Sequence, residues 1–360
     1  IIQSLKLKNF RNYELLNLTF HPVTNIFHGD NAQGKTNILE AVYLAGTTKS
    51  HRGTKDRDMI SFGEEESHIE VKVLKNGVPF RIDIHLKKNS PKGAAINRMP
   101  VKRASELFGI INLVFFSPED LNIIKNGPAQ RRRFMDLELS QLDKIYLNNL
   151  ADYNRVVNQR NRLLKEMAFQ EKLKDTLEIW DMQLVRYGER VMEGRKKFLR
   201  EINEIVGDIH GKLTGGRERL VMEYEPSTGE LSLEEAVRRN RERDIRMKST
   251  SAGPHRDDIC FKIKDMDIRK FGSQGQQRTA ALSLKLAEIE IVKRVIHDTP
   301  VLLLDDVLSE LDKHRQNYLL DSIHDIQTLI TCTGVEEFVN HRFSINKVFL
   351  VQNGQVTNEN

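Results

Sequence analysis

The chain has 360 residues, of which 39% are hydrophobic and 30% charged, so it is long enough for about two domains with a substantial core. Its 56 basic and 51 acidic side chains give a net charge of +5, which permits an acidic partner such as DNA without requiring one. No apolar run approaches the roughly 18 residues of a membrane helix, and the first residues lack a signal-peptide core. We therefore expect a cytoplasmic protein that has no membrane partner.

Strand patterns dominate the first third of the chain. Alternating or continuous apolar residues predict strands at 5–9, 16–20, 68–74, 80–86 and 111–116. The dipeptide Asn76-Gly77, between the third and fourth of these, is typical of a hairpin turn. These patterns predict a mixed sheet around the first helix.

A phosphate-binding motif lies between a strand-like segment at 25–28 and a segment with helical spacing of apolar residues at 37–44. The motif fills the pattern GxxxxGK[ST] with Gly29, Asp30, Asn31, Ala32, Gln33, Gly34, Lys35 and Thr36. In such a loop, backbone N–H groups and the start of the next helix face the phosphates of a nucleoside triphosphate. We expect Lys35 to reach the β- and γ-phosphates and Thr36 to bind Mg²⁺.

The pattern becomes helical and highly charged from Pro128 to about Gly211. A patch rich in glycine, proline and serine follows, and a further charged helical run covers 233–247. Strand and helix patterns then alternate to the last residues. We therefore predict an α/β domain of residues 1–127 and 250–360, with an inserted α-helical arm at 128–249.

A second acidic motif completes the predicted nucleotide site. Residues 301–304 form an apolar strand that ends in Asp305 and Asp306, the form of a Walker B element. We expect Asp305 to hold Mg²⁺, directly or through water, and Asp306 to act as the general base that orients water. Lys35 and Asp305 are 270 residues apart in the sequence, which agrees with a large insertion between the two halves of the site.

A loop of small and polar residues precedes the helix pattern that begins near residue 274. It contains Ser273, Gln274, Gly275 and Gln276, and such a helix start can face an anion. An ordinary helix-start loop is the alternative for this segment considered alone.

Two basic segments could contact nucleic acid phosphates without sequence preference. The first has no acidic residue between its ends and contains Lys87, Lys88, Lys92, Arg98, Lys102 and Arg103. The second lies at the start of the arm and contains Arg131 and Arg132. Solvated charge is the alternative for both. The loop at 253–258 and Trp180 are interpreted as structural rather than as a metal site and a base-stacking platform.

The motifs together resemble the ABC-type ATPase heads of SMC-like chromosome proteins. Over the whole chain the sequence more closely resembles the RecF family of bacterial DNA replication and repair proteins. The resemblance rests on residues 8–13, 29–36, 116–121, 131–136, 253–258, 272–278 and 303–312, in that order along the chain.

The resemblance implies an ATP-binding fold in which two ATP molecules are sandwiched in a head-to-tail homodimer. Ser273 and its neighbours would contact the γ-phosphate bound to the other subunit, Arg11 would approach the phosphates, and Asp312 would lie near the dimer seam. The family resemblance also implies weak DNA-dependent ATPase activity, binding to duplex and gapped DNA, and loading of RecA with help from RecR and RecO.

Three departures from the ABC pattern predict slow hydrolysis that serves as a timing switch. Asp306 stands where many ABC proteins have a glutamate, and no glutamine follows the strand at 111–116. No histidine ends the strand at 329–333, so Thr331 or Thr333 could replace it.

Other functions fit the sequence less well. A structural SMC-like tether needs arms of hundreds of residues or a CxxC hook, and this chain has neither. The basic segments and the missing glutamine and histidine disfavour a transporter subunit, and the spacing of the two Walker motifs disfavours a nucleoside kinase.

Overall fold

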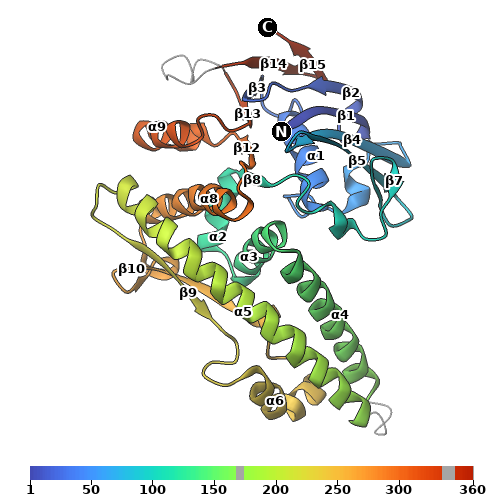
Figure 1. Ribbon diagram of the computed structural model, residues 1–360, viewed down its shortest axis with the longest axis vertical. Coiled ribbons are helices and arrows are strands. Elements are labelled where there is room, and N and C mark those ends of the chain that lie inside the picture. Colours follow the sequence, from blue (N-terminus) through green and yellow to red (C-terminus); the bar gives the residue numbers. More distant parts are fainter. Residues whose placement is uncertain (168–173, 335–344, 360) are drawn as a thin grey trace. The chain divides into compact units, whose positions relative to one another are not determined.

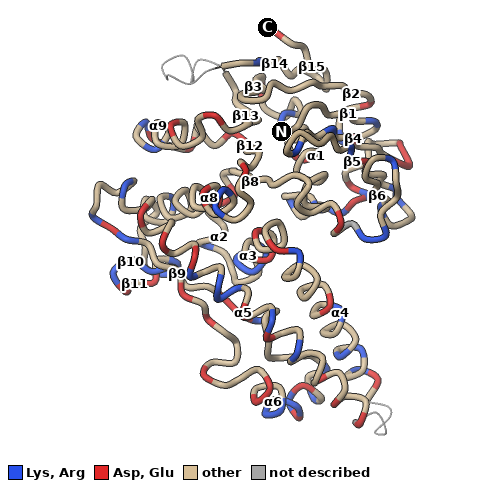
Figure 2. The backbone as a smooth tube through the Cα atoms, viewed as in Figure 1, with Lys and Arg blue, Asp and Glu red and all other residues tan. Residues whose placement is uncertain are grey.

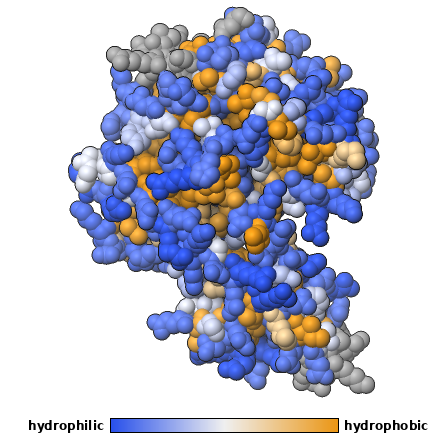
Figure 3. All heavy atoms as spheres, in the orientation of Figure 1, coloured by the Kyte–Doolittle hydropathy of each residue, from blue (hydrophilic) through white to orange (hydrophobic). Residues whose placement is uncertain are grey.

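The computed structural model describes residues 1–167, 174–334 and 345–359. Figure 1 shows the order of its helices and strands along the chain. Hydrophilic residues cover most of the face seen in Figure 3, with apolar residues between them. Among the described helices, none has a stretch long and apolar enough to cross a membrane.

The chain forms two compact units, one of residues 1–120 with 288–360 and the other of residues 121–287. The first unit is therefore built from both ends of the chain. The predicted division of the chain, with an inserted domain at 128–249, stays a prediction.

The first unit contains a six-stranded antiparallel sheet. Its strands follow the order β2 (Tyr13–Thr19), β1 (Ile2–Phe10), β4 (Glu66–Lys75), β5 (Val78–Lys87), β6 (Gly93–Ile96) and β7 (Met99–Pro100). Buried and exposed residues alternate along β1 and β2, as expected of strands with one face on the core. Asn76 and Gly77 have φ values of 50° and 76°, as a type I′ turn between β4 and β5 requires. The four strands predicted in this region are confirmed, but they form an antiparallel sheet, and the fifth predicted strand, at 111–116, belongs to the other sheet.

A second sheet of the first unit carries β3 near its middle. Its strands follow the order β15 (Gln355–Asn358), β14 (Lys347–Gln352), β3 (Thr24–His28), β13 (Thr328–Cys332), β12 (Val301–Asp305) and β8 (Leu113–Phe116). All neighbours except β15 pair in parallel. Their residues are almost continuously buried, because a parallel sheet is covered on both faces. The loop after β3 and the end of β12 consequently lie at the same edge of the sheet.

The first unit also contains helices and short turns. The helices are α1 (Lys35–Thr47), α9 (Lys313–Ser322) and the last part of α8 (Gln274–Ile296), and short 3₁₀ turns lie at Asp56–Met59, Ala104–Leu107, Pro118–Asp120 and Leu308–Glu310. Helix α1 contacts β4 and β5 of the antiparallel sheet and β8, β12 and β13 of the parallel sheet. Because α1 has neighbours on more than one side, most of its residues are buried.

The second unit is mainly helical. It contains α2 (Leu121–Lys125), α3 (Pro128–Leu142), α4 (Lys144–Glu166), α5 (Lys174–Leu213), α6 (Leu233–Met247), α7 (Ile268–Phe271) and the start of α8, with a 3₁₀ turn at Pro254–Arg256. Helices α4 and α5 lie side by side (Figure 1). Trp180 packs against a buried cluster that includes Leu164 and Leu177, which confirms the packing role predicted for it.

The second unit also has a three-stranded antiparallel sheet that the sequence analysis predicted only in part. Its strands follow the order β11 (Met266–Asp267), β10 (Asp258–Ile263) and β9 (Leu220–Glu225). Strand β10 lies where strand patterns were predicted to resume after residue 247, whereas β9 lies in the patch rich in glycine, proline and serine, where no strand was predicted. Asn203 of α5 binds both backbone groups of Met222, at 2.7 and 2.8 Å, so part of the β9 edge is satisfied by a side chain.

The loop at 253–258 has the structural role predicted for it. The His255 ring lies 2.6 Å from the hydroxyl of Tyr153, and Pro254 O accepts a hydrogen bond of 2.7 Å from the buried Arg195. Asp257 accepts hydrogen bonds from the Tyr224 hydroxyl and the Ser227 backbone. Burial lowers the pKa of His255, so the ring is held in its neutral form inside this network.

Candidate nucleotide site

The phosphate-binding loop has a backbone that only glycine can adopt at two positions. Gly29 and Gly34 have φ values of 138° and 113°. A Cβ on Gly29 would lie 2.3 Å from Val351 O, and a Cβ on Gly34 would lie 2.5 Å from Asn12 Nδ2. The two glycines therefore allow the close approach of neighbouring segments as well as the turn itself.

Two hairpin turns hold the loop in place. At the β1–β2 turn, Asn12 Nδ2 donates to Gln33 O at 3.0 Å and the Tyr13 hydroxyl donates to Gly34 O at 3.0 Å. At the β14–β15 turn, Asn353 N donates to Gln33 Oε1 at 2.6 Å. The loop is thus braced on both sides before any ligand binds, which lowers the entropy lost on binding.

Lys35 folds back on the loop that precedes it. Its Nζ donates to Gly29 O and, at 2.9 Å, to Asp30 O, and the residue is only 7% exposed. Helix α1 has no side-chain cap and no acidic residue in its first turn. The helix start therefore keeps its positive electrostatic character, and an ammonium group lies beside it.

The hydroxyl of Thr36 joins the loop to the Walker B strand. Thr36 Oγ1 donates to Asp305 Oδ1 at 2.8 Å, and Thr331 at the end of β13 donates to the same oxygen at 2.7 Å. These residues line a cavity of about 270 Å³ together with Asn31, Ala32, Gln33, Gly34, Lys35, Asn37, Arg52 and Asp306. The structure therefore brings the two predicted motifs together at one site.

The donor set of this cavity fits Mg²⁺. Thr36 and Asp305 offer a hydroxyl and a carboxylate oxygen in hydrogen-bond contact, and Mg²⁺ prefers such hard oxygen ligands. Within the described residues there is no cluster of three or more His, Cys, Asp or Glu side chains that could hold a metal. Mg²⁺ beside a nucleotide needs only one or two carboxylates, because phosphate and water supply its other ligands.

Asp306 lies next to the metal candidate in an unusual backbone conformation. Its φ is 52°, and its backbone N–H donates to Thr331 Oγ1 at 3.0 Å. Burial raises the pKa of Asp306, against the opposing attraction of Lys35 and with a contribution from Asp305. A carboxyl with a raised pKa is suited to accept a proton from water.

The positions of two arginines were not expected from the sequence. Arg11 was expected to approach the phosphates, but its guanidinium donates to both oxygens of the buried Glu40, at 2.8 and 2.9 Å. Arg52, which the sequence analysis did not single out, lines the cavity and donates to Asn37 Oδ1 at 3.4 Å. No motif marks Arg52, because it lies in an irregular segment after α1.

The predicted signature residues lie at the start of α8, in the second unit. Ser273 N donates to Gln276 Oε1 at 2.9 Å, and Gln276 N donates to Ser273 Oγ at 3.2 Å, which is a reciprocal capping box. Ser273, Gln274 and Gly275 are exposed, and Gln276 is half-buried. Because the Ser273 hydroxyl accepts the Gln276 N–H, its own proton is left to donate elsewhere.

The first basic segment is only partly committed to contacts within the chain. Its exposed members are Lys87, Arg98, Lys102 and Arg103. Lys88 pairs with Glu65 and Lys92 with Asp56, each at 3.1 Å. Figure 2 shows blue basic residues interspersed with red acidic ones along α4, α5 and α6.

Arg131 and Arg132 bind other parts of the second unit. Arg131 is 3% exposed, and its guanidinium donates to both carboxylate oxygens of Asp258 at 2.6 and 3.0 Å. Arg132 donates to Asp257 O at 2.7 Å. The DNA contact predicted for Arg131 does not fit this burial, because its charge is already paired inside the unit.

Comparison with known proteins gives matches along the whole chain. A family model described as the RecF/RecN/SMC N-terminal domain matches residues 1–357. The DNA replication and repair protein RecF of Lachnospira eligens is 63% identical over 362 residues, which cover 100% of both chains.

Solved structures give the same result for the fold. A structure of the recombination mediator protein RecF with ATP in the RecFOR pathway has a TM-score of 0.93 at 34% identity, and covers 100% of this chain and 97% of that one. The Smc head domain of Pyrococcus furiosus bound to the C-terminal domain of ScpA has a TM-score of 0.58 at 16% identity, with 99% and 96% covered. The predicted ABC-type ATPase head with mixed sheets is confirmed.

Proposed function

Because the chain belongs to the RecF family of DNA replication and repair proteins, we propose that it acts as an ATP-controlled switch on DNA. The observation that carries this proposal is the contact of 2.8 Å between Thr36 Oγ1 and Asp305 Oδ1, which closes a Walker A and Walker B pair around one cavity. The solved structure of RecF with ATP, whose sequence is 34% identical to this chain, supports ATP as the nucleotide.

ATP binding is assigned to the first unit, with Mg²⁺ held by Thr36 and Asp305. Lys35 exchanges its loop carbonyl partners for phosphate oxygens, since an ammonium bound to neutral carbonyls gains more from a charged acceptor. Bound Mg²⁺ supplies charge neutralisation of the phosphates. Of the two nearby arginines, Arg52 on the cavity wall is better placed for phosphate than Arg11, which is held by Glu40.

The signature residues at the start of α8 act on the ATP of a second copy. Ser273, Gln274 and Gly275 are exposed in a helix start whose capping box leaves a hydroxyl proton to donate. An ATP that contacts both copies stabilises their complex by its differential affinity, and hydrolysis removes that link. The dimer therefore lasts as long as the nucleotide.

Hydrolysis is slow in this proposal, so that it times the dimer rather than powers movement. Asp306 is the general base, and its short side chain reaches less far than the glutamate common in ABC proteins. Thr331 takes the place of the missing histidine, because its hydroxyl contacts both Asp305 and the Asp306 backbone, whereas Thr333 lies after β13 and is exposed.

DNA binding uses phosphate contacts that do not depend on sequence. The exposed cations of the first basic segment are the best candidates, and they are Lys87, Arg98, Lys102 and Arg103. The dimer would act in the cytoplasm on duplex and gapped DNA and help to load RecA. RecR and RecO are proposed as partners because the chain belongs to the RecF family and because a solved relative is described as part of the RecFOR pathway.

An SMC-like structural role remains the alternative, and the lengths of the helices disfavour it. Helices α4 and α5 have 23 and 40 residues, far short of the hundreds that a chromosome tether needs. The Smc head resembles this chain at the level of the fold alone.

The test measures ATP turnover and self-association with and without duplex DNA, for the parent, Lys35→Met and Ser273→Arg. We expect Lys35→Met to lose ATP binding, and Ser273→Arg to keep ATP binding but lose ATP-dependent self-association. Lys72→Met, at an exposed lysine of β4, is the matched control and should behave as the parent. If DNA changes neither turnover nor self-association of the parent, the proposal is wrong.

A further inference from the structure

A single acidic residue holds the signature helix start from a distant part of the second unit. Glu218 lies in the loop between α5 and β9, and its Oε1 accepts a hydrogen bond of 2.9 Å from Gln276 Nε2. The two residues are 58 positions apart in the sequence. Among the described residues, Glu218 is thus a hydrogen-bond partner that reaches the capping-box side chain of Gln276 from outside α8.

This contact decides what the Gln276 amide can do. Gln276 Oε1 accepts from Ser273 N, and Gln276 Nε2 is the donor to Glu218. An amide side chain held at both ends cannot rotate without breaking one of these bonds. The position of Gln276 in turn fixes the backbone of Ser273, which is the residue proposed to meet the partner's ATP.

The loop that carries Glu218 is itself fixed. Thr214 Oγ1 contacts both backbone groups of Glu218 at 3.3 Å. Glu218 Oε2 also lies 3.5 Å from Nε2 of the fully buried His210 in α5. Both carboxylate oxygens therefore face groups of the same unit.

His210 contacts α8 at a second point. Ser283 Oγ donates to Thr279 O at 2.7 Å, so at its contact of 3.0 Å with His210 it must accept a proton from Nδ1–H. Glu218 and His210 thus hold α8 at Gln276 and at Ser283, two turns apart along the helix.

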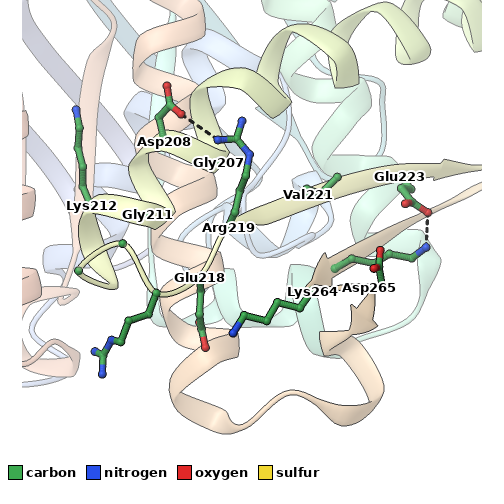
Figure 4. A pocket seen from close by; sticks show the side chains of 14 residues that line it. Gly207, Asp208, Gly211, Lys212, Glu218, Arg219, Val221, Glu223, Lys264 and Asp265 are labelled. Carbon is green, nitrogen blue, oxygen red and sulfur yellow. Dashed lines mark hydrogen bonds and ion pairs between the residues drawn. The ribbon is translucent and has the colours of Figure 1, made fainter.

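The Glu218 side chain is partly exposed to solvent, although both of its carboxylate oxygens face other residues of the unit. It lies on the wall of an open pocket of about 930 Å³, and its side chain is 23% exposed. Figure 4 shows it on the pocket wall, with Arg219 turned instead toward Asp208. A substitution here removes a contact without opening a cavity in the core.

We propose that Glu218 is a positioning residue for the signature element: it holds the Gln276 amide, and through it Ser273, in the arrangement that completes the ATP site of a second copy. This inference rests on the proposed function for the role of Ser273. The contact between Glu218 and Gln276, called the brace below, can itself be measured on the protein without nucleotide.

The first test is hydrogen exchange of the amides at the start of α8 in the ATP-free protein. Glu218→Ala should speed exchange at Ser273 and Gln276 by roughly fivefold, the effect of losing one hydrogen bond. Glu218→Gln should exchange as the parent does, because its amide oxygen still accepts from Gln276. Glu223→Ala is the matched control, since Glu223 lines the same pocket and pairs with Lys262 instead.

A paired substitution tests the contact directly. Gln276→Glu keeps the acceptor for Ser273 N but places a second carboxylate against Glu218, so exchange should rise at least as much as in Glu218→Ala. Adding Glu218→Gln to this variant restores a donor and an acceptor with their roles exchanged, and should return exchange to near the parental rate. Parental exchange in Glu218→Ala, or no recovery in the double variant, overturns the inference.

The second test measures ATP-dependent self-association of the same variants. Glu218→Ala should weaken it on the order of tenfold with ATP affinity unchanged, and Glu218→Gln should restore it. If the brace is seen by exchange but the parent does not self-associate with ATP, the proposed function fails and the brace stands. If the parent associates and Glu218→Ala associates equally well, the positioning role fails and the proposed function stands.

Discussion

Thr331 Oγ1 donates a hydrogen bond of 2.7 Å to Asp305 Oδ1, the carboxylate oxygen that also accepts from Thr36 at 2.8 Å. The same Thr331 oxygen accepts the backbone N–H of Asp306 at 3.0 Å. One hydroxyl on β13 therefore contacts the carboxylate of Asp305 and the backbone of Asp306.

We expect Thr331→Val, which keeps the shape of the side chain, to reduce ATP turnover about tenfold. The loss of roughly 1.4 kcal/mol reflects one buried hydroxyl contact to a charged group. ATP affinity should change less than about threefold, because Lys35 and the loop are untouched. Turnover and equilibrium binding are the measurements, and Thr331→Ser should recover the parental rate. If the valine variant hydrolyses ATP at the parental rate, Thr331 has no role in turnover.

The backbone of Asp306 separates its chemical role from its structural one. With φ at 52°, the position tolerates aspartate and asparagine better than most residues. We expect Asp306→Asn to keep the stability and ATP affinity of the parent and to lose nearly all turnover, whereas Asp306→Ala should also lose roughly 1 kcal/mol of stability. An asparagine variant that hydrolyses ATP at the parental rate is the contrary result.

The pKa of Asp306 also predicts a pH dependence of turnover. Burial raises this pKa above its ordinary value of 3.8, and a protonated carboxyl cannot act as a base. Turnover should therefore fall as the pH drops through the raised pKa. A pH–rate profile of kcat/KM, which reports the pKa values of the free protein, checks this, and the small residual turnover of Asp306→Asn should show no acid limb.

The buried pair of Arg11 and Glu40 predicts an acid-dependent loss of stability. Burial by itself raises the pKa of Glu40, but hydrogen bonds from Arg11 and Ser50 outweigh it and leave the pKa below its ordinary value of 4.5. The pair therefore stabilises the fold above about pH 4.5, and this contribution is lost as the pH falls through the lower folded-state pKa.

Glu40→Gln should reduce the free energy of unfolding by about 3 kcal/mol at pH 7, because it leaves the Arg11 charge without its partner. The difference from the parent should shrink below pH 4.5. Urea denaturation across this range is the measurement, with Glu64→Gln at an exposed site as control. A difference that does not change with pH contradicts the assignment.

Substitution of two cations from the predicted DNA-binding set should affect different properties of the protein. Arg131→Ala leaves Asp258 without one of its arginine partners in a half-buried site, and we expect a loss of about 3 kcal/mol in stability. Lys102→Ala removes an exposed charge, so stability should change by less than about 0.5 kcal/mol. Lys102→Ala should instead lower the salt dependence of duplex binding by about one ion. Thermal unfolding and DNA titrations at several salt concentrations distinguish the two.

Local patterns predicted much of the fold because they act over a few residues. The charged run at 233–247 has the bounds of α6, and Ser232 and Glu235 form the capping box at its start. The hairpin at Asn76 and Gly77 follows from turn chemistry alone. Strand β9 was not predicted, because its few alternating residues lie between two turn-rich segments that favour a loop.

The site was predictable where its geometry is written into consecutive residues. The phosphate loop and the acids at 305–306 are such cases, and the structure brings them together. Pairings between distant residues are different, because the charge of a side chain does not identify its partner. The contacts of Arg11 with Glu40 and of Arg131 with Asp258 join positions 29 and 127 residues apart, and neither could be inferred from the sequence.

The position of β3 has a consequence for synthesis of the protein. Its two neighbours in the sheet are β13 and β14, whose residues follow it by about 300 positions. The strand that leads into the nucleotide site therefore has no sheet partners until the ribosome has made β13, about 300 residues later. On the proposal above, a nascent chain at this stage can neither bind ATP nor associate with DNA. The proposed switch therefore becomes available only after β13 and β14 have been made.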